Sequence, residues 1–192
     1  MGRLVDFWRA SRDEADEWCQ GRSFVARAIL LAYLVYAGVQ HMRSHEYRSW
    51  FGGITLIVHE IGHFIFAGFG RTMTILGGTI MQLLVPLAAA VYLLLRQRDY
   101  FGFAVCGGWL SFSMWDMATY VGDARREALP LVAFGDNPKH DWSTLLTQWH
   151  VLNHAEAFAT AIRVGAFGCW ALSMSLGAWI CYRMWRWGKT QA

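Results

Sequence analysis

Charged residues and prolines are scarce in this chain. Asp, Glu, Lys and Arg make up only 16% of the 192 residues, and there are three prolines, so the charge content lies well below that of an ordinary soluble domain. The formal net charge is only +3, and the basic residues are scattered along the chain. This balance excludes nucleic acid as an expected partner. The sequence also contains no internal repeat and no low-complexity tract.

Disulfide and signal-peptide patterns are missing as well. The four cysteines form no Cys-x-x-Cys pair, and three of them fall within apolar runs, where cysteine behaves as a small hydrophobic residue. We therefore expect free thiols. Residues 1–22 carry charges of both signs and lack the basic, apolar and small-residue regions of a cleavable signal. Insertion into a membrane is expected to depend on the spanning segments themselves.

Apolar residues are abundant. They make up 55% of the chain, and the 11 Trp and seven Tyr suit a protein with two membrane–water interfaces. Five segments approach the roughly 20 residues needed to cross a bilayer, namely 23–40, 50–70, 75–95, 101–121 and 157–182. The sequence thus predicts an all-α, polytopic membrane bundle of about five transmembrane helices. Membrane lipids are the expected surroundings, in a cell membrane such as the inner membrane of a bacterium.

The domain organisation follows from these segments. Residues 1–22 interleave aromatic and charged side chains, which favours an amphipathic interfacial helix, with a solvated helical tail as the alternative. Residues 23–192 form one transmembrane domain, in which a polar connection over 122–156 separates the last two spans. Asp141 is predicted to cap a helix beginning at Trp142. This helix is expected to follow the interface and continue into the last span.

The most informative motif is His59-Glu60-Ile61-Gly62-His63, which lies in the middle of the predicted span 50–70. A charged group near the bilayer centre costs at least about 2.5–3.5 kcal/mol, so such residues usually have a function. On a helix, His59 and His63 project from the same face. Two imidazoles at this spacing can hold Zn²⁺, with Glu60 as the general base for an attacking water.

A catalytic zinc usually has three protein ligands, and Asp116 is the predicted third. It lies within the predicted span 101–121, where a carboxylate without a counter-charge is expensive. Asp123, seven residues later, is the alternative, although Arg125 and Arg126 offer it a salt bridge. A metal-free interpretation also stays open, in which the motif pairs with Asp116 or Arg163 and only holds the bundle together.

The motif within a membrane helix resembles the site-2-protease class of intramembrane zinc metalloproteases. That family carries H-E-x-x-H on the first helix of a three-span core and an aspartate ligand on the third. Residues 50–121 match this order, and Gly77, Gly78 and Pro86 in the middle span are similar to the family's substrate-admitting segment. The resemblance implies His59, His63 and Asp116 as zinc ligands and Glu60 as the catalytic base.

Three functions are compatible with these features. The first is an integral membrane zinc metalloprotease that hydrolyses a peptide bond in or near the bilayer of a transmembrane protein substrate. The second is a non-catalytic subunit that stabilises a larger membrane complex on a protease-derived fold. The third is a transporter with a binding site at the midplane, against which the missing inverted repeat counts.

Two more histidine pairs have the same spacing of four residues. His41 and His45 stand among charged residues at the end of the first predicted span, so we expect them to be solvated at the interface. His150 and His154 lie on the polar connection. They are expected at the interface too, with a second metal site as the alternative.

Overall fold

The computed structural model describes residues 12–130 and 140–191, and every element of regular structure in these ranges is helical. Residues 12–19 form a first helix. The elements that follow are α2 (Val25–Arg43), α3 (Phe51–Phe66), η1 (Ala67–Phe69), α4 (Arg71–Leu95), α5 (Tyr100–Asp123), α6 (Asp141–Gln148), η2 (Leu152–His154) and α7 (Ala155–Gln191). The predicted all-α fold is confirmed for the described residues. Half of the predicted N-terminal helix and residues 131–139 of the predicted polar connection lie outside them.

Four helical segments in the described ranges are long and apolar enough to cross a membrane. They are Val25–Arg43, Phe51–Phe69, Arg71–Leu95 and Leu152–Thr190. The sequence predicts five, and α5 is the helix that does not qualify, because its Gly, Ser and Asp residues lower its mean hydropathy. Twelve of its 24 residues are buried. The buried residues include the polar side chains of Ser111, Ser113 and Asp123.

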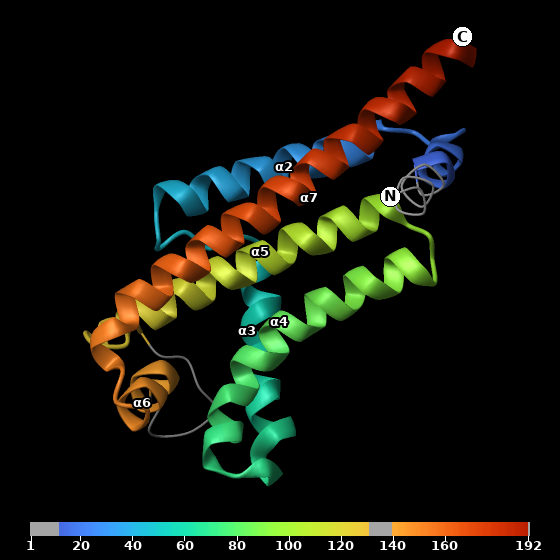
Figure 1. Cartoon of the computed structure of the whole chain (residues 1–192). Coiled ribbons are helices and arrows are strands. Elements are labelled where there is room, and N and C mark those ends of the chain that lie inside the picture. Colours follow the sequence, from blue (N-terminus) through green and yellow to red (C-terminus); the bar gives the residue numbers. More distant parts are fainter. Residues whose placement is uncertain (1–11, 131–139, 192) are drawn as a thin grey trace, which may run out of the picture.

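The helices are arranged around α5 (Figure 1). One side of α5 packs along α7 and α2, where Leu34, Phe112 and Met174 belong to a common apolar cluster. The other side packs against α4, which in turn packs against α3. Figure 1 shows the turn between α3 and α4 at the end of the molecule where α6 lies.

Glycine allows α3 and α4 to approach each other closely. A Cβ added at Gly77 would lie 2.5 Å from the carbonyl oxygen of Gly62, and a Cβ at Gly62 would overlap the Gly77 carbonyl. Small residues at a crossing point let the backbones of two membrane helices come into contact. Gly70 makes the turn between these helices possible, because its φ of 89° is unfavourable for residues with a side chain.

The short helix α6 is docked against the end of this hairpin. Leu145 and Leu146 are each only 1% exposed, and Leu146 packs against Val121 of α5 and Ala159 of α7. At the far end of α6, the Gln148 side-chain amide donates a hydrogen bond to the Thr72 hydroxyl at 3.1 Å. These contacts bring the polar connection back to the first turn of α4.

The start and the end of α6 differ from the sequence prediction. His140, not Asp141, is the N-cap, because its Nδ1 accepts the backbone N–H of Ser143 at 3.1 Å. Asp141 is the first helical residue, and its carboxylate is free to point elsewhere. The helix also does not continue into α7. His150, with a φ of 58°, breaks it, and η2 precedes α7.

Candidate metal centre

Two histidines and one aspartate converge at the end of the α3–α4 hairpin. One ligand atom from each of His59, His63 and Asp141 lies within 4.8 Å of the others. The Oδ2 atom of Asp141 lies 3.2 Å from Nε2 of His59 and 3.3 Å from Nε2 of His63. Ligands at about 2.0–2.2 Å from a tetrahedral zinc are separated by roughly 3.3–3.5 Å. The two separations from Asp141 therefore suit three ligands of one zinc ion.

The hydrogen bonds behind the two imidazoles fix their orientation. His59 Nδ1 lies 2.9 Å from Oε1 of Gln82, and His63 Nδ1 lies 2.9 Å from the carbonyl oxygen of Thr74. The Gln82 amide nitrogen donates to the carbonyl of Ser113 at 2.7 Å. Since that carbonyl can only accept, the Gln82 oxygen must face His59. Both Nδ1 atoms are thus hydrogen-bond donors.

This arrangement leaves the Nε2 lone pairs aimed at Asp141. Metal-ligating histidines almost always donate their other ring N–H to a carbonyl, carboxylate or water in this way. Two Nε2 lone pairs that face one carboxylate oxygen need a positive charge between them, from a proton or from a metal ion. The chemistry of the donors therefore fits a divalent cation such as Zn²⁺.

The backbone of α4 leaves room for the two imidazoles. A Cβ added at Gly78 would lie 2.6 Å from Nε2 of His59 and 2.7 Å from Nε2 of His63. A side chain at this position would therefore occupy space directly against both candidate ligand atoms. A glycine at position 78 is therefore needed for the site.

Asp141 stays ionised at its position. Burial raises the pKa of its carboxyl group, but the hydrogen bonds and positive charges of His59 and His63, when both rings are protonated at Nε2, together outweigh burial, so the net pKa lies below the usual value. Its backbone N–H donates to the Tyr120 hydroxyl at 2.9 Å. Asp141 thus provides an ionised carboxylate to the site, and its position is fixed by α6 and by the hydrogen bond to Tyr120 of α5.

Glu60 lies on α3 between the two histidines, and its side chain is partly buried. It interacts electrostatically with His63 and with Tyr120. The predicted base therefore neighbours the predicted ligands along α3 and lies within electrostatic reach of Tyr120 on α5.

Asp116 does not join this group. Its carboxylate accepts a hydrogen bond from Arg48 at 3.2 Å, and the neighbouring Thr119 hydroxyl donates to the backbone of His45. This face of α5 meets the connection between α2 and α3. A buried carboxylate does need a counter-charge, as the sequence suggested, but the structure supplies Arg48 for it.

Asp123 and Arg163 are engaged elsewhere as well. Asp123 accepts the backbone N–H groups of Ala128 and Leu129 and so closes the turn after α5. Arg163 pairs with Glu156 at 2.9 Å. Among the described residues, His59, His63 and Asp141 are the one group of three metal-ligating side chains close enough to share an ion.

The remaining histidines divide into exposed and buried ones. His150 and His154 are exposed, as expected for an interfacial position. The expectation for His41 is wrong, because this residue is only 3% exposed and its ring stacks against those of Phe112 and Trp115. All four cysteines are free, as predicted.

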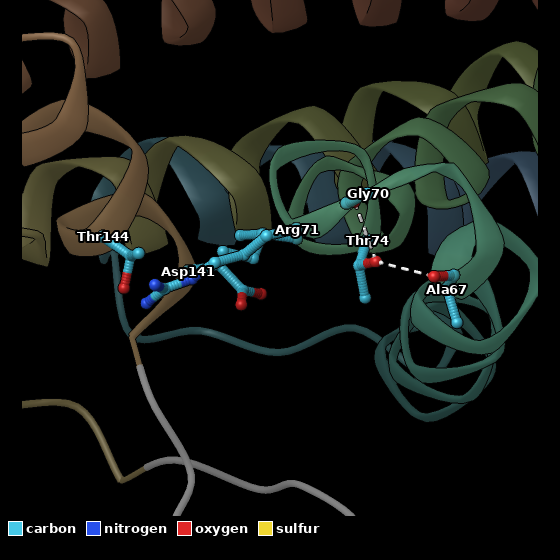
Figure 2. Close-up of a pocket in the computed structure, with 7 residues that line it drawn as sticks. Ala67, Gly70, Arg71, Thr74, Asp141 and Thr144 are labelled. Carbon is cyan, nitrogen blue, oxygen red and sulfur yellow. Dashed lines mark hydrogen bonds between the residues drawn. The ribbon is translucent and has the colours of Figure 1, made fainter.

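A hollow of about 520 Å³ adjoins the candidate centre (Figure 2). Asp141 and Thr144 of α6 line one side of it, and Gly70, Arg71 and Thr74 from the start of α4 line the other. Figure 2 shows the Asp141 carboxylate directed toward the space between α6 and the α3–α4 turn. The centre is thus reached from the end of the helical hairpin.

Asp141 and Tyr120 are the residues that the sequence prediction missed. Asp141 stands directly before a predicted helix, where capping explains an aspartate without any chemistry. The only sequence feature that could have indicated a role in the site is its position in a polar connection that is long enough to fold back onto the α3–α4 hairpin. Gln82 and the backbone carbonyl of Ser113 form a hydrogen-bonded chain between helices directly behind His59.

Comparison with known proteins gives no match for this chain, whether against family models, curated proteins or solved structures.

Proposed function

We propose that the protein is an integral membrane zinc hydrolase that cleaves a peptide bond at the membrane. The observation that carries this proposal is the convergence of the Nε2 atoms of His59 and His63 on Oδ2 of Asp141, with both Nδ1 atoms held by oxygen acceptors. In this proposal Asp141 replaces Asp116 as the third ligand. The inner membrane of a bacterium stays the predicted location.

Each residue of the centre has a separate role in the proposed hydrolysis. His59, His63 and Asp141 hold the ion, which supplies an acidic water and polarises a carbonyl group when bound. Glu60 accepts the proton of the attacking water and passes it to the leaving amine. Gln82 and Thr74 hold the imidazoles in the orientation that binding requires.

The position of the hollow indicates where a substrate would enter. His63 lies six residues before the end of the candidate span Phe51–Phe69, which is about 9 Å along a helix. The hollow opens at that end of the hairpin, beside the polar first turn of α4. A peptide bond near the membrane surface is therefore the proposed target, because water and an extended chain can both reach it.

The test combines metal analysis with turnover of a membrane-anchored model polypeptide. We expect about one zinc per chain in the purified wild-type protein and none in His59→Ala. Glu60→Gln should keep the zinc and lose about 10²–10⁴-fold in kcat, the contribution of a general base. Glu46→Gln, in the exposed connection between α2 and α3, is the matched control and should behave as wild type.

Two results would contradict the proposal. Wild-type protein without zinc would remove the metal centre altogether. Zinc without turnover of the model polypeptide would instead favour a non-catalytic subunit of a larger membrane complex. Co-purification with that complex in fixed stoichiometry would then be expected.

A further inference from the structure

Tyr120 of α5 contacts two of the proposed ligands, Asp141 and His59, without being a ligand itself. Its hydroxyl oxygen accepts the backbone N–H of Asp141 at 2.9 Å. Its ring packs against the His140 ring, with centroids 4.1 Å apart, and stands edge-on to the His59 ring at 6.3 Å. The phenol is therefore held between the helix that carries one ligand and the helix that carries the other two.

The hydroxyl proton of Tyr120 has no acceptor among the described residues. The one hydrogen bond of this group uses the oxygen as acceptor, so the O–H remains available as a donor. Because the backbone N–H of Asp141 occupies one side of the Tyr120 hydroxyl oxygen, the hydroxyl proton must point away from that N–H group. The carboxylates of Glu60 and Asp141 are both within electrostatic reach of the phenol, so the phenol lies near the groups assigned to the reaction.

Peptide hydrolysis creates a need for such a donor. When the water oxygen bonds to the carbonyl carbon, the π electrons of the C=O bond move onto the carbonyl oxygen, and Glu60 takes the proton of the water. The electron pair on that oxygen then re-forms the C=O bond as the C–N bond breaks, and the amine leaves with the proton that Glu60 took from the water. A donor aimed at the oxygen that becomes negative stabilises the transition state more than the substrate.

We propose that the Tyr120 hydroxyl donates a hydrogen bond to the substrate oxygen that becomes negative during hydrolysis, while its oxygen positions Asp141. This inference rests on the proposed function. Tyr120 keeps its proton throughout the reaction. It is a catalytic residue through the donated bond and a positioning residue through the accepted one.

Tyr120→Phe separates the two roles because it removes the hydroxyl and keeps the ring. The matched control is Tyr100→Phe on the same helix, whose hydroxyl donates to Glu14 at the opposite end of α5. For each variant we would measure zinc affinity by chelator competition, and kcat and KM at saturating zinc. Tyr120→Phe should lower kcat by about 10²–10³-fold, the effect of losing one such donor, with KM within about threefold of wild type.

A purely structural role gives a different pattern. If Tyr120 only positions Asp141, the variant should lose about 10–100-fold in zinc affinity and regain wild-type kcat once zinc saturates it. Recovered kcat, or a kcat within about threefold of wild type, would overturn the proposal.

A binding measurement keeps the inference testable if wild-type protein shows no turnover. Acetohydroxamate is an anionic metal ligand that offers an oxygen where the substrate carbonyl would lie, and its binding to cobalt-substituted protein is followed by visible absorption. Tyr120→Phe should weaken this binding by about tenfold, as expected for a lost hydrogen bond to a charged group. Equal binding to both proteins would contradict the inference, whereas absent turnover alone would contradict only the proposed peptidase activity.

Discussion

Two regions of this protein contain the same set of residue types, namely two histidines four residues apart and an aspartate from another helix. In the His41 region these are His41, His45 and Asp116. In the candidate metal centre they are His59, His63 and Asp141. Only the second set brings its ligand atoms together.

The surroundings of the histidines account for the difference. The His41 ring packs against the Phe112 and Trp115 rings, and its buried Nε2 has no hydrogen-bond partner among the described residues. Arg48 neutralises Asp116. In the candidate centre, Gln82 and Thr74 engage both Nδ1 atoms, and the carboxylate faces both Nε2 atoms. The α2 helix also ends at Arg43, so His45 does not share a helix with His41, whereas His59 and His63 both lie on α3. A metal site therefore needs the helical spacing, oxygen acceptors behind the rings and a carboxylate that no arginine pairs with.

The largest expected effect comes from removing the space beside the imidazoles. Gly78→Ala should abolish zinc binding, because its Cβ would lie 2.6–2.7 Å from both Nε2 atoms. Gly53→Ala on α3 is the control, since an added Cβ there meets no atom within 4 Å. Zinc content per chain after purification measures both. Wild-type zinc content in Gly78→Ala would show that the ion does not sit between these imidazoles.

A smaller effect is expected from the acceptor behind His59. Gln82→Leu leaves the ring without its partner at Nδ1, which should weaken zinc binding by about 10–100-fold. Chelator competition gives this ratio. Gln97→Leu, at the exposed turn between α4 and α5, should have unchanged affinity. An unchanged affinity in Gln82→Leu would contradict the role assigned to this hydrogen bond.

The smallest effect is expected in the His41 region. His41→Phe keeps a ring in the stack with Phe112 and Trp115 and removes a buried nitrogen without a partner. Replacing such a group by an apolar one of similar shape is nearly neutral or stabilising. The melting temperature in detergent should stay the same or rise, with zinc content unchanged. A loss of zinc would show that the two regions are coupled.

Much of the fold could be predicted from the sequence, because long apolar runs specify helices by themselves. Each predicted span corresponds to a helix, although α5 is too polar to count as a candidate span. His59 and His63 could be predicted because one helix sets their spacing. Asp141 could not, because its position depends on how α6 docks through Leu146 and Tyr120. No local pattern in the chain encodes that contact.

Asp116 also shows that the sequence does not determine which groups meet in the folded protein. The cost of a buried carboxylate correctly predicted a positive partner, but not whether that partner would be a metal ion or an arginine. Arg48 lies in the short connection between α2 and α3. Only the packing of that connection against α5 decides the pairing.

The most direct test of the account compares the two aspartates. Asp141→Asn and Asp116→Asn each remove one negative charge and keep the shape of the side chain, and zinc per chain is measured by mass spectrometry after identical purification. We expect zinc to be lost, or to fall well below one per chain, in Asp141→Asn and to stay near one per chain in Asp116→Asn. Zinc retained in Asp141→Asn and lost in Asp116→Asn would contradict the assignment of the third ligand.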